Sequence, residues 1–143
     1  MAESTLKRGV LDTSVVVGLS DIDPDDLPDE MSISAVTLAE LAAGPRATSD
    51  PVVQARRQHR LQWAEATFDP LPFDASAARA YGLVYASVVA AGRKPRGRRA
   101  VDLFIAATAL ALRVPVYTCN PDDFVGIDGL EVIPVGTSPS SVG

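Results

Sequence analysis

The stretch that decides the fold is Gly9-Val10-Leu11-Asp12-Thr13-Ser14, which predicts a short buried strand ending in a carboxylate. Val10 and Leu11 are typical of a strand, and apolar residues resume at Val15 just after the polar corner. Asp12 therefore lies at a predicted strand-to-helix corner, where it could cap the following helix. Ligands of open α/β sheets bind outside the carboxyl ends of the strands, so Asp12 could equally belong to a functional site. This stretch alone favours neither interpretation.

Predicted strands and helices alternate along the rest of the chain. Helices are expected at residues 13–20, 36–43, 52–68, 75–91 and 100–112, and extended segments at 31–34, 71–73, 116–118 and 130–133. The segment 100–112 is apolar nearly all round, which is typical of a buried helix. The alternation predicts a three-layer α/β/α fold with a central parallel sheet of four to five strands. We expect one domain over residues 1–135 and a flexible tail over 136–143.

Polar residues mark the expected starts of several helices. Ser34 and Asp74 are candidate N-caps, and Asp50-Pro51 combines a cap with a proline in the first turn. Within the helix 75–91, apolar residues at helical spacing predict a buried stripe. That stripe consists of Ala78, Tyr81, Tyr85, Val88 and Val89.

Composition narrows the class of protein. The net charge of -5 argues against a protein that only coats nucleic acid, because such proteins are usually basic. Cys119 is the single cysteine, so no internal disulfide can form, and with His59 as the single histidine a Cys/His metal site is nearly excluded. No run approaches the roughly 18 apolar residues of a membrane span, and the N-terminus lacks the apolar segment of a signal peptide. We expect a cytoplasmic protein without a membrane partner.

Further acidic residues lie in sequence surroundings like those of Asp12. Glu40 lies in the apolar helix 36–43, Asp102 in the first turn of the helix 100–112, and Asp122 and Asp123 follow the strand 116–118. A carboxylate buried without a partner costs several kcal/mol. Asp102 could therefore cap its helix, where the helix dipole favours negative charge, or it could bind a cation together with other acids.

A parallel sheet would bring these acids to one edge. The corner after the first strand and the turn after residue 118 would open on the same side, so three or four carboxylates would converge. Such a cluster repels itself unless a divalent ion neutralises it. Carboxylate oxygens are the ligands that Mg²⁺ and Mn²⁺ prefer, and ions held in this way activate water and stabilise phosphoryl transition states.

Four segments, in this order, resemble the PIN-domain ribonucleases, in particular the VapC toxins of VapBC toxin–antitoxin pairs. The segments are Leu11-Asp12-Thr13-Ser14, 39–44, 101–109 and 118–124. The resemblance covers nearly the whole chain. It implies a Mg²⁺- or Mn²⁺-dependent endoribonuclease whose action inhibits translation and growth. It also implies a cognate VapB-type antitoxin and a homodimer.

The same resemblance assigns roles to individual residues. The acids that would hold the metal and carry catalysis are Asp12, Glu40, Asp102 and Asp123, with Asp122 as an alternative fourth acid. Thr118 and Asn120 match polar positions beside the metal, and Thr13 and Ser14 would shape the floor of the pocket. Cys119 stands where family members often carry Arg or Asn, which bears on how the substrate phosphate is held.

Basic residues cluster in the non-helical segment 92–99, where they could hold an RNA backbone at the mouth of the acidic pocket. They are Arg93, Lys94, Arg96, Arg98 and Arg99, and Arg46 is a weaker candidate for the same role. A solubilising loop, or one that contacts an acidic partner, explains this segment equally well.

Two other classes of function compete with the ribonuclease. One is a catalytically weak RNA-binding module on the same PIN scaffold. The other is a different acid-rich phosphoryl enzyme, which the sequence disfavours. A haloacid-dehalogenase-type phosphatase needs a second Asp where this chain has Ser14, and a receiver domain needs a lysine later than Lys94.

Overall fold

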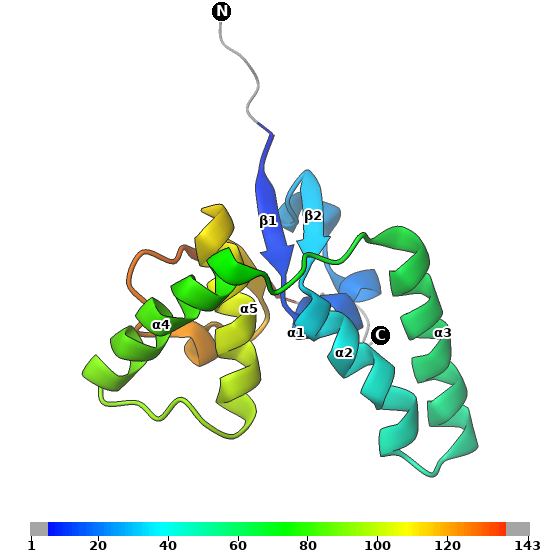
Figure 1. The fold of residues 1–143 in the computed structure, drawn as a ribbon. Helices are drawn as coiled ribbons and strands as arrows, with labels where there is room; N and C mark the ends of the chain where they lie inside the picture. Colours follow the sequence, from blue (N-terminus) through cyan, green and yellow to red (C-terminus); the bar gives the residue numbers. More distant parts are fainter. Residues whose placement is uncertain (1–5, 137–143) are drawn as a thin grey trace, which may run out of the picture.

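The computed structural model describes residues 6–136 and contains a parallel sheet of four strands between two groups of helices (Figure 1). The strands are β1 (Arg8–Leu11), β2 (Glu30–Ile33), β3 (Val116–Thr118) and β4 (Val132–Pro134), in the order β2-β1-β3-β4. All three neighbouring pairs are parallel, as the sequence predicts. The last strand begins two residues later than expected. The extended segment at 71–73 contributes only one bridge, between Leu71 and Ser34. Apart from Gly136, the predicted tail lies outside the described residues.

The helices lie close to their predicted positions. They are α1 (Thr13–Val17), α2 (Ala35–Ala43), α3 (Pro51–Thr67), α4 (Ala75–Ala90) and α5 (Arg98–Leu112), with short 3-10 turns η1 (Leu19–Asp21), η2 (Pro24–Asp26), η3 (Gly44–Ala47) and η4 (Pro121–Phe124). The predicted caps are confirmed, because Ser34, Asp50 and Asp74 each accept a hydrogen bond from a backbone N–H of the first turn. These N–H groups have no partner within the helix itself.

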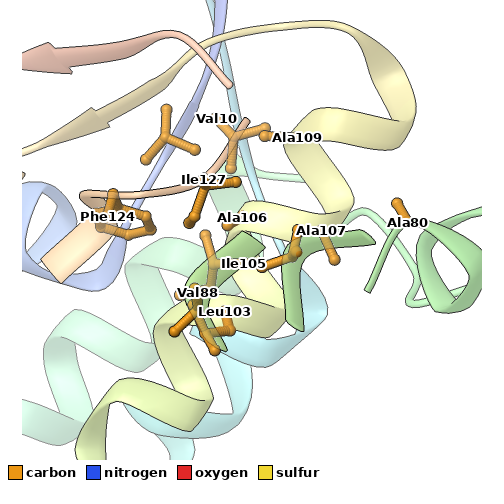
Figure 2. Packing of buried hydrophobic residues seen from close by; sticks show 12 residues of the cluster. Val10, Ala80, Val88, Leu103, Ile105, Ala106, Ala107, Ala109, Phe124 and Ile127 are labelled. Carbon is orange, nitrogen blue, oxygen red and sulfur yellow. The ribbon is translucent and has the colours of Figure 1, made fainter. Parts of the chain in front are cut away.

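Side chains that alternate along the strands build a core on each face of the sheet. On one face, Val10 and Val116 pack with buried residues of α4 and α5. Figure 2 shows this cluster, with Val88 and Leu103 among its members from the two helices. On the other face, Leu11 and Tyr117 pack with residues of α1, α2 and α3. In Figure 1 the two helical groups accordingly flank the strands on opposite sides. The predicted three-layer α/β/α architecture is confirmed.

The buried face of α4 differs from the predicted stripe. Tyr85 and Val89 are 47% and 50% exposed, and Ala78 is also exposed. The buried residues are Ala77, Ala80, Val84 and Val88. Val88 is thus buried as predicted, and it shares with Ala77, Ala80 and Val84 a face on the side of α4 that packs against α5. Tyr81 is half-buried, and its ring stacks on Phe104 at a centroid distance of 4.7 Å.

Helix α5 begins two residues earlier than the sequence predicts, which changes the position of Asp102. Gly97 occupies the N-cap position with a φ of 70°, a conformation that glycine adopts without strain. Asp102 is therefore the fifth helical residue, in the second turn. A capping role for Asp102 is excluded, because the N–H groups that need caps and most of the dipole effect belong to the first turn.

No helix within residues 6–136 has the length and apolar character needed to cross a bilayer.

Candidate functional site

Asp12 lies where β1 ends, directly beside the end of β3. Its backbone N–H donates to the carbonyl of Tyr117 (3.1 Å), which continues the ladder between the two strands. Its Oδ1 accepts from the N–H of Val15 (3.2 Å) and the hydroxyl of Ser14 (2.6 Å), and its Oδ2 accepts from the hydroxyl of Thr118 (2.6 Å). The capping interpretation of Asp12 is therefore confirmed, since Asp12 is the N-cap of α1. Its Oδ2 takes no part in the cap and is bound by Thr118 of β3.

The carboxylate of Asp12 is buried, and no countercharge lies beside it among the residues that the structure describes. Only 4% of the residue is exposed, and burial raises the pKa of its carboxyl group above the ordinary value of 3.8, although hydrogen bonds from Ser14 and Thr118 oppose that rise. No cationic side chain among the described residues pairs with it. A bound cation would compensate this burial in the way that a salt bridge does elsewhere.

This burial predicts a pH-dependent stability for the protein without metal. A raised folded-state pKa means that the contribution of Asp12 to stability is full below pH 3.8 and is lost as the pH rises through the folded-state pKa. We expect Asp12→Asn to raise the unfolding temperature of EDTA-treated protein at pH 7, with a difference that shrinks toward pH 3.8. Thermal unfolding of both proteins at several pH values measures this. A variant that is less stable by the same amount at every pH would contradict the prediction.

Thr13 connects the corner of Asp12 to Glu40. The hydroxyl of Thr13 is hydrogen-bonded to Glu40 Oε1 and to the hydroxyl of Thr37 (3.1 Å). Glu40 is exposed, whereas Thr37 is fully buried. The neighbouring residues Thr13 and Ser14 are thus hydrogen-bonded to Glu40 and Asp12, respectively. The bond to Glu40 is possible because α2 packs against α1.

Thr37 is a member of the site that was not predicted from the sequence. The available signal was its spacing, because Thr37 stands three residues before Glu40 and residues so spaced share one face of a helix.

Backbone groups of residues 118–120 hold the polar pocket together. The hydroxyl of Thr118 donates to Asp12 and accepts the N–H of Asn120 (2.9 Å). The N–H of Cys119 donates to the hydroxyl of Ser14 (3.1 Å). Cys119 therefore contributes its backbone to this site. The structure brings together a set of predicted residues consisting of Asp12, Thr13, Ser14, Glu40, Thr118 and Asn120.

The remaining predicted acids lie on two other elements, Asp102 on α5 and Asp122 and Asp123 in η4. Helix α5, which carries Asp102, packs against both α2 and η4, so the elements that bear the acids are neighbours. Asp123 is half-buried in η4, and Asp122 beside it is exposed. Within residues 6–136, no three Asp, Glu, Cys or His side chains lie close enough together to hold a metal ion. The convergence of three or four carboxylates on one metal ion stays a prediction.

The basic segment is attached to the turn that carries Asp122 and Asp123. The guanidinium of Arg93 donates to the backbone carbonyl of Asp122 (3.0 Å). Lys94 and Arg96 are exposed, Arg99 is half-buried in the first turn of α5, and Arg46 is exposed in η3. The side chain of Arg98 lies outside the described part of the chain.

The family follows from comparison with known proteins. The parallel sheet between two groups of helices makes this an α/β protein, with Asp12 at the carboxyl edge of the sheet. The family model of the PIN domain matches residues 9–130. The chain belongs to the PIN-domain family. It is 36% identical to Ribonuclease VapC5 of Mycobacterium tuberculosis over 129 residues, which cover 88% of this chain and 92% of the relative. It is 30% identical to Ribonuclease VapC of Rickettsia bellii over 131 residues, covering 88% and 95%.

A solved structure gives the same result. The crystal structure of VapBC-5 from Mycobacterium tuberculosis, a member of the VapBC family of toxin–antitoxin systems, is similar to this chain with a TM-score of 0.78. The sequences are 37% identical, and the match covers 90% of this chain and 98% of the other. The PIN-like fold and the resemblance to VapC proteins predicted from four short segments are confirmed.

Proposed function

We propose that this protein is a divalent-metal-dependent endoribonuclease that hydrolyses RNA phosphodiester bonds. The observation that carries the proposal is Asp12, a buried carboxylate at the carboxyl edge of the sheet, held by two hydroxyls and paired with no described cation. The two VapC relatives are both ribonucleases by name, which supports the same activity here.

The donor chemistry of the site suits Mg²⁺ or Mn²⁺. Carboxylate oxygens are hard ligands, and the buried charge of Asp12 favours a cation beside it. The residues proposed to hold the ion are Asp12, Glu40, Asp102 and Asp123, with Asp122 as the alternative to Asp123. When bound, such an ion activates water and stabilises charge on the phosphate.

The protein's own residues then orient these ligands and the RNA. Ser14 and Thr118 fix both oxygens of Asp12, and Thr13 fixes Glu40. For the RNA backbone we propose the basic side chains of Arg46, Arg93, Lys94, Arg96, Arg98 and Arg99. Their positive charge would offset the repulsion between phosphates and an acidic pocket. The contact between Arg93 and η4 supports this arrangement, because it keeps the basic segment beside the turn that bears Asp123.

We further propose that the protein acts in the cytoplasm as the toxin of a toxin–antitoxin pair, inhibiting translation and growth until a VapB-type antitoxin binds it. The similarity to VapBC-5 supports this role. A homodimer is proposed as well, and large apolar side chains exposed on α4 support a partner surface there. They include Leu83, Tyr85 and Val89.

Removal of metal tests the proposed activity directly. Purified protein incubated with a mixture of cellular RNAs should release discrete fragments in Mn²⁺ or Mg²⁺, release none in EDTA, and regain cleavage when excess metal is restored. Mapping the new RNA ends would define the target. Tight RNA binding without fragments in Mn²⁺ would contradict the nuclease and favour the RNA-binding module.

A further inference from the structure

We propose that Thr37 is a positioning residue that fixes the carboxylate of Glu40 through the hydroxyl of Thr13. This inference rests on the proposed metal-dependent nuclease, because it gives Glu40 a task that requires a fixed orientation. Thr37 belongs to α2 and is fully buried, whereas Glu40 on the same helix is exposed.

The direction of the hydrogen bonds follows from the chemistry of the groups. Thr13 Oγ1 lies within hydrogen-bond reach of both Glu40 Oε1 and Thr37 Oγ1. A hydroxyl has one proton to donate, and an ionised carboxylate only accepts. Thr13 therefore donates to Glu40, and its oxygen accepts the proton of Thr37. The result is a chain of donors that runs from Thr37 through Thr13 to Glu40.

These two hydrogen bonds link the exposed carboxylate of Glu40 to a side chain that is fixed in the core. The branched side chain of Thr37 is stiff at χ1, and burial holds it in one place. Glu40, in contrast, has a long and exposed side chain that loses considerable rotamer freedom when it is fixed. Because Thr37 donates to the Thr13 oxygen, the Thr13 proton is turned away from Thr37, which leaves Glu40 as its acceptor. Hydroxyl groups also orient the carboxylate of Asp12, because Ser14 and Thr118 each donate a hydrogen bond to one of its two oxygens.

The test uses Thr37→Val, which keeps the shape of the side chain and removes the hydroxyl. We expect Mn²⁺ binding to the RNA-free protein, followed by electron paramagnetic resonance, to weaken by about 10-fold, because groups that orient a metal ligand typically contribute 10–100-fold to affinity. RNA cleavage should fall in kcat with little change in KM. Thr37→Ser restores the hydroxyl and should return Mn²⁺ binding to near the wild-type value.

Thr108→Val is the matched control. Thr108 is also a buried helical threonine, but its hydroxyl donates to the carbonyl of Phe104 in its own helix (3.1 Å). The same chemical change there should leave Mn²⁺ binding unaltered, whatever it does to the unfolding temperature.

Each outcome of these measurements decides the proposal. Wild-type Mn²⁺ affinity in Thr37→Val would overturn it, as would equal weakening by Thr37→Ser and Thr37→Val. If the wild-type protein bound no Mn²⁺, the proposal would fail together with the metal site. If it bound Mn²⁺ but cleaved no RNA, the nuclease proposal alone would fail, because metal binding is measured without RNA.

Discussion

Asp12→Asn will lower RNA cleavage by on the order of 100-fold or more while the protein stays folded, since even groups that merely orient a metal ligand contribute 10–100-fold. The amide removes the negative charge that a divalent ion needs. It keeps an oxygen able to accept from Ser14 and from the N–H of Val15, so the cap of α1 survives. The loss should therefore appear in activity and not in folding.

Single-turnover cleavage with saturating Mn²⁺, together with circular dichroism, measures both parts of this prediction. Asp26→Asn provides the control, because Asp26 is an exposed acid in η2 and the change alters net charge equally. Cleavage by Asp12→Asn within a few-fold of the Asp26→Asn rate would remove Asp12 from the proposed metal site.

The largest expected effect on stability comes from Gly9→Ala. A Cβ added at Gly9 would lie 2.3 Å from Cε1 and 2.5 Å from Cδ1 of the Tyr117 ring on the neighbouring strand. Tyr117 is itself 4% exposed, so its rigid ring has little room to move. Overpacking of this kind typically costs about 1–3 kcal/mol, and here it acts on the two central strands.

Urea unfolding of Gly9→Ala, with Gly82→Ala as the control, measures this cost. Gly82 lies in α4, and apart from its chain neighbours and the adjacent turns of its own helix backbone no heavy atom lies within 4 Å of an added Cβ. Alanine there should therefore stabilise the protein by about 0.5–1 kcal/mol. In a Tyr117→Ala background, Gly9→Ala should cost less, because the clashing ring is gone. Undiminished stability of the single variant Gly9→Ala would show that the strands separate easily to admit the methyl group.

Local sequence signals predicted most of the fold because the physics behind them is local. A side-chain oxygen at Ser34, Asp50 or Asp74 satisfies N–H groups two or three residues away, and each of these caps was found. The errors came from packing between distant elements. The buried face of α4, which consists of two alanines and two valines, was set by its fit against α5, and the start of α5 was set by Gly97.

The site was predictable to the extent that strand topology decides it. Parallel pairing of β1 with β3 brings Thr118 to Asp12, and this contact follows from the order of strands and helices. The role of Thr37 depends on how α2 is rotated against α1, which no local pattern specifies. The same limitation applies to Asp102, whose position relative to Glu40 depends on how helices from opposite faces of the sheet meet.

The pairing of β1 with β3 also has a consequence for synthesis on the ribosome. Asp12 and Thr118, whose side chains meet, are 106 positions apart in the sequence. A growing chain that has not yet exposed Thr118 lacks the strand against which the corner of Asp12 is built, so it cannot assemble the pocket. Closing such a long loop is slow compared with forming local helices. A nascent chain therefore cannot show the activity proposed for this pocket before Thr118 has been synthesised and has left the ribosome.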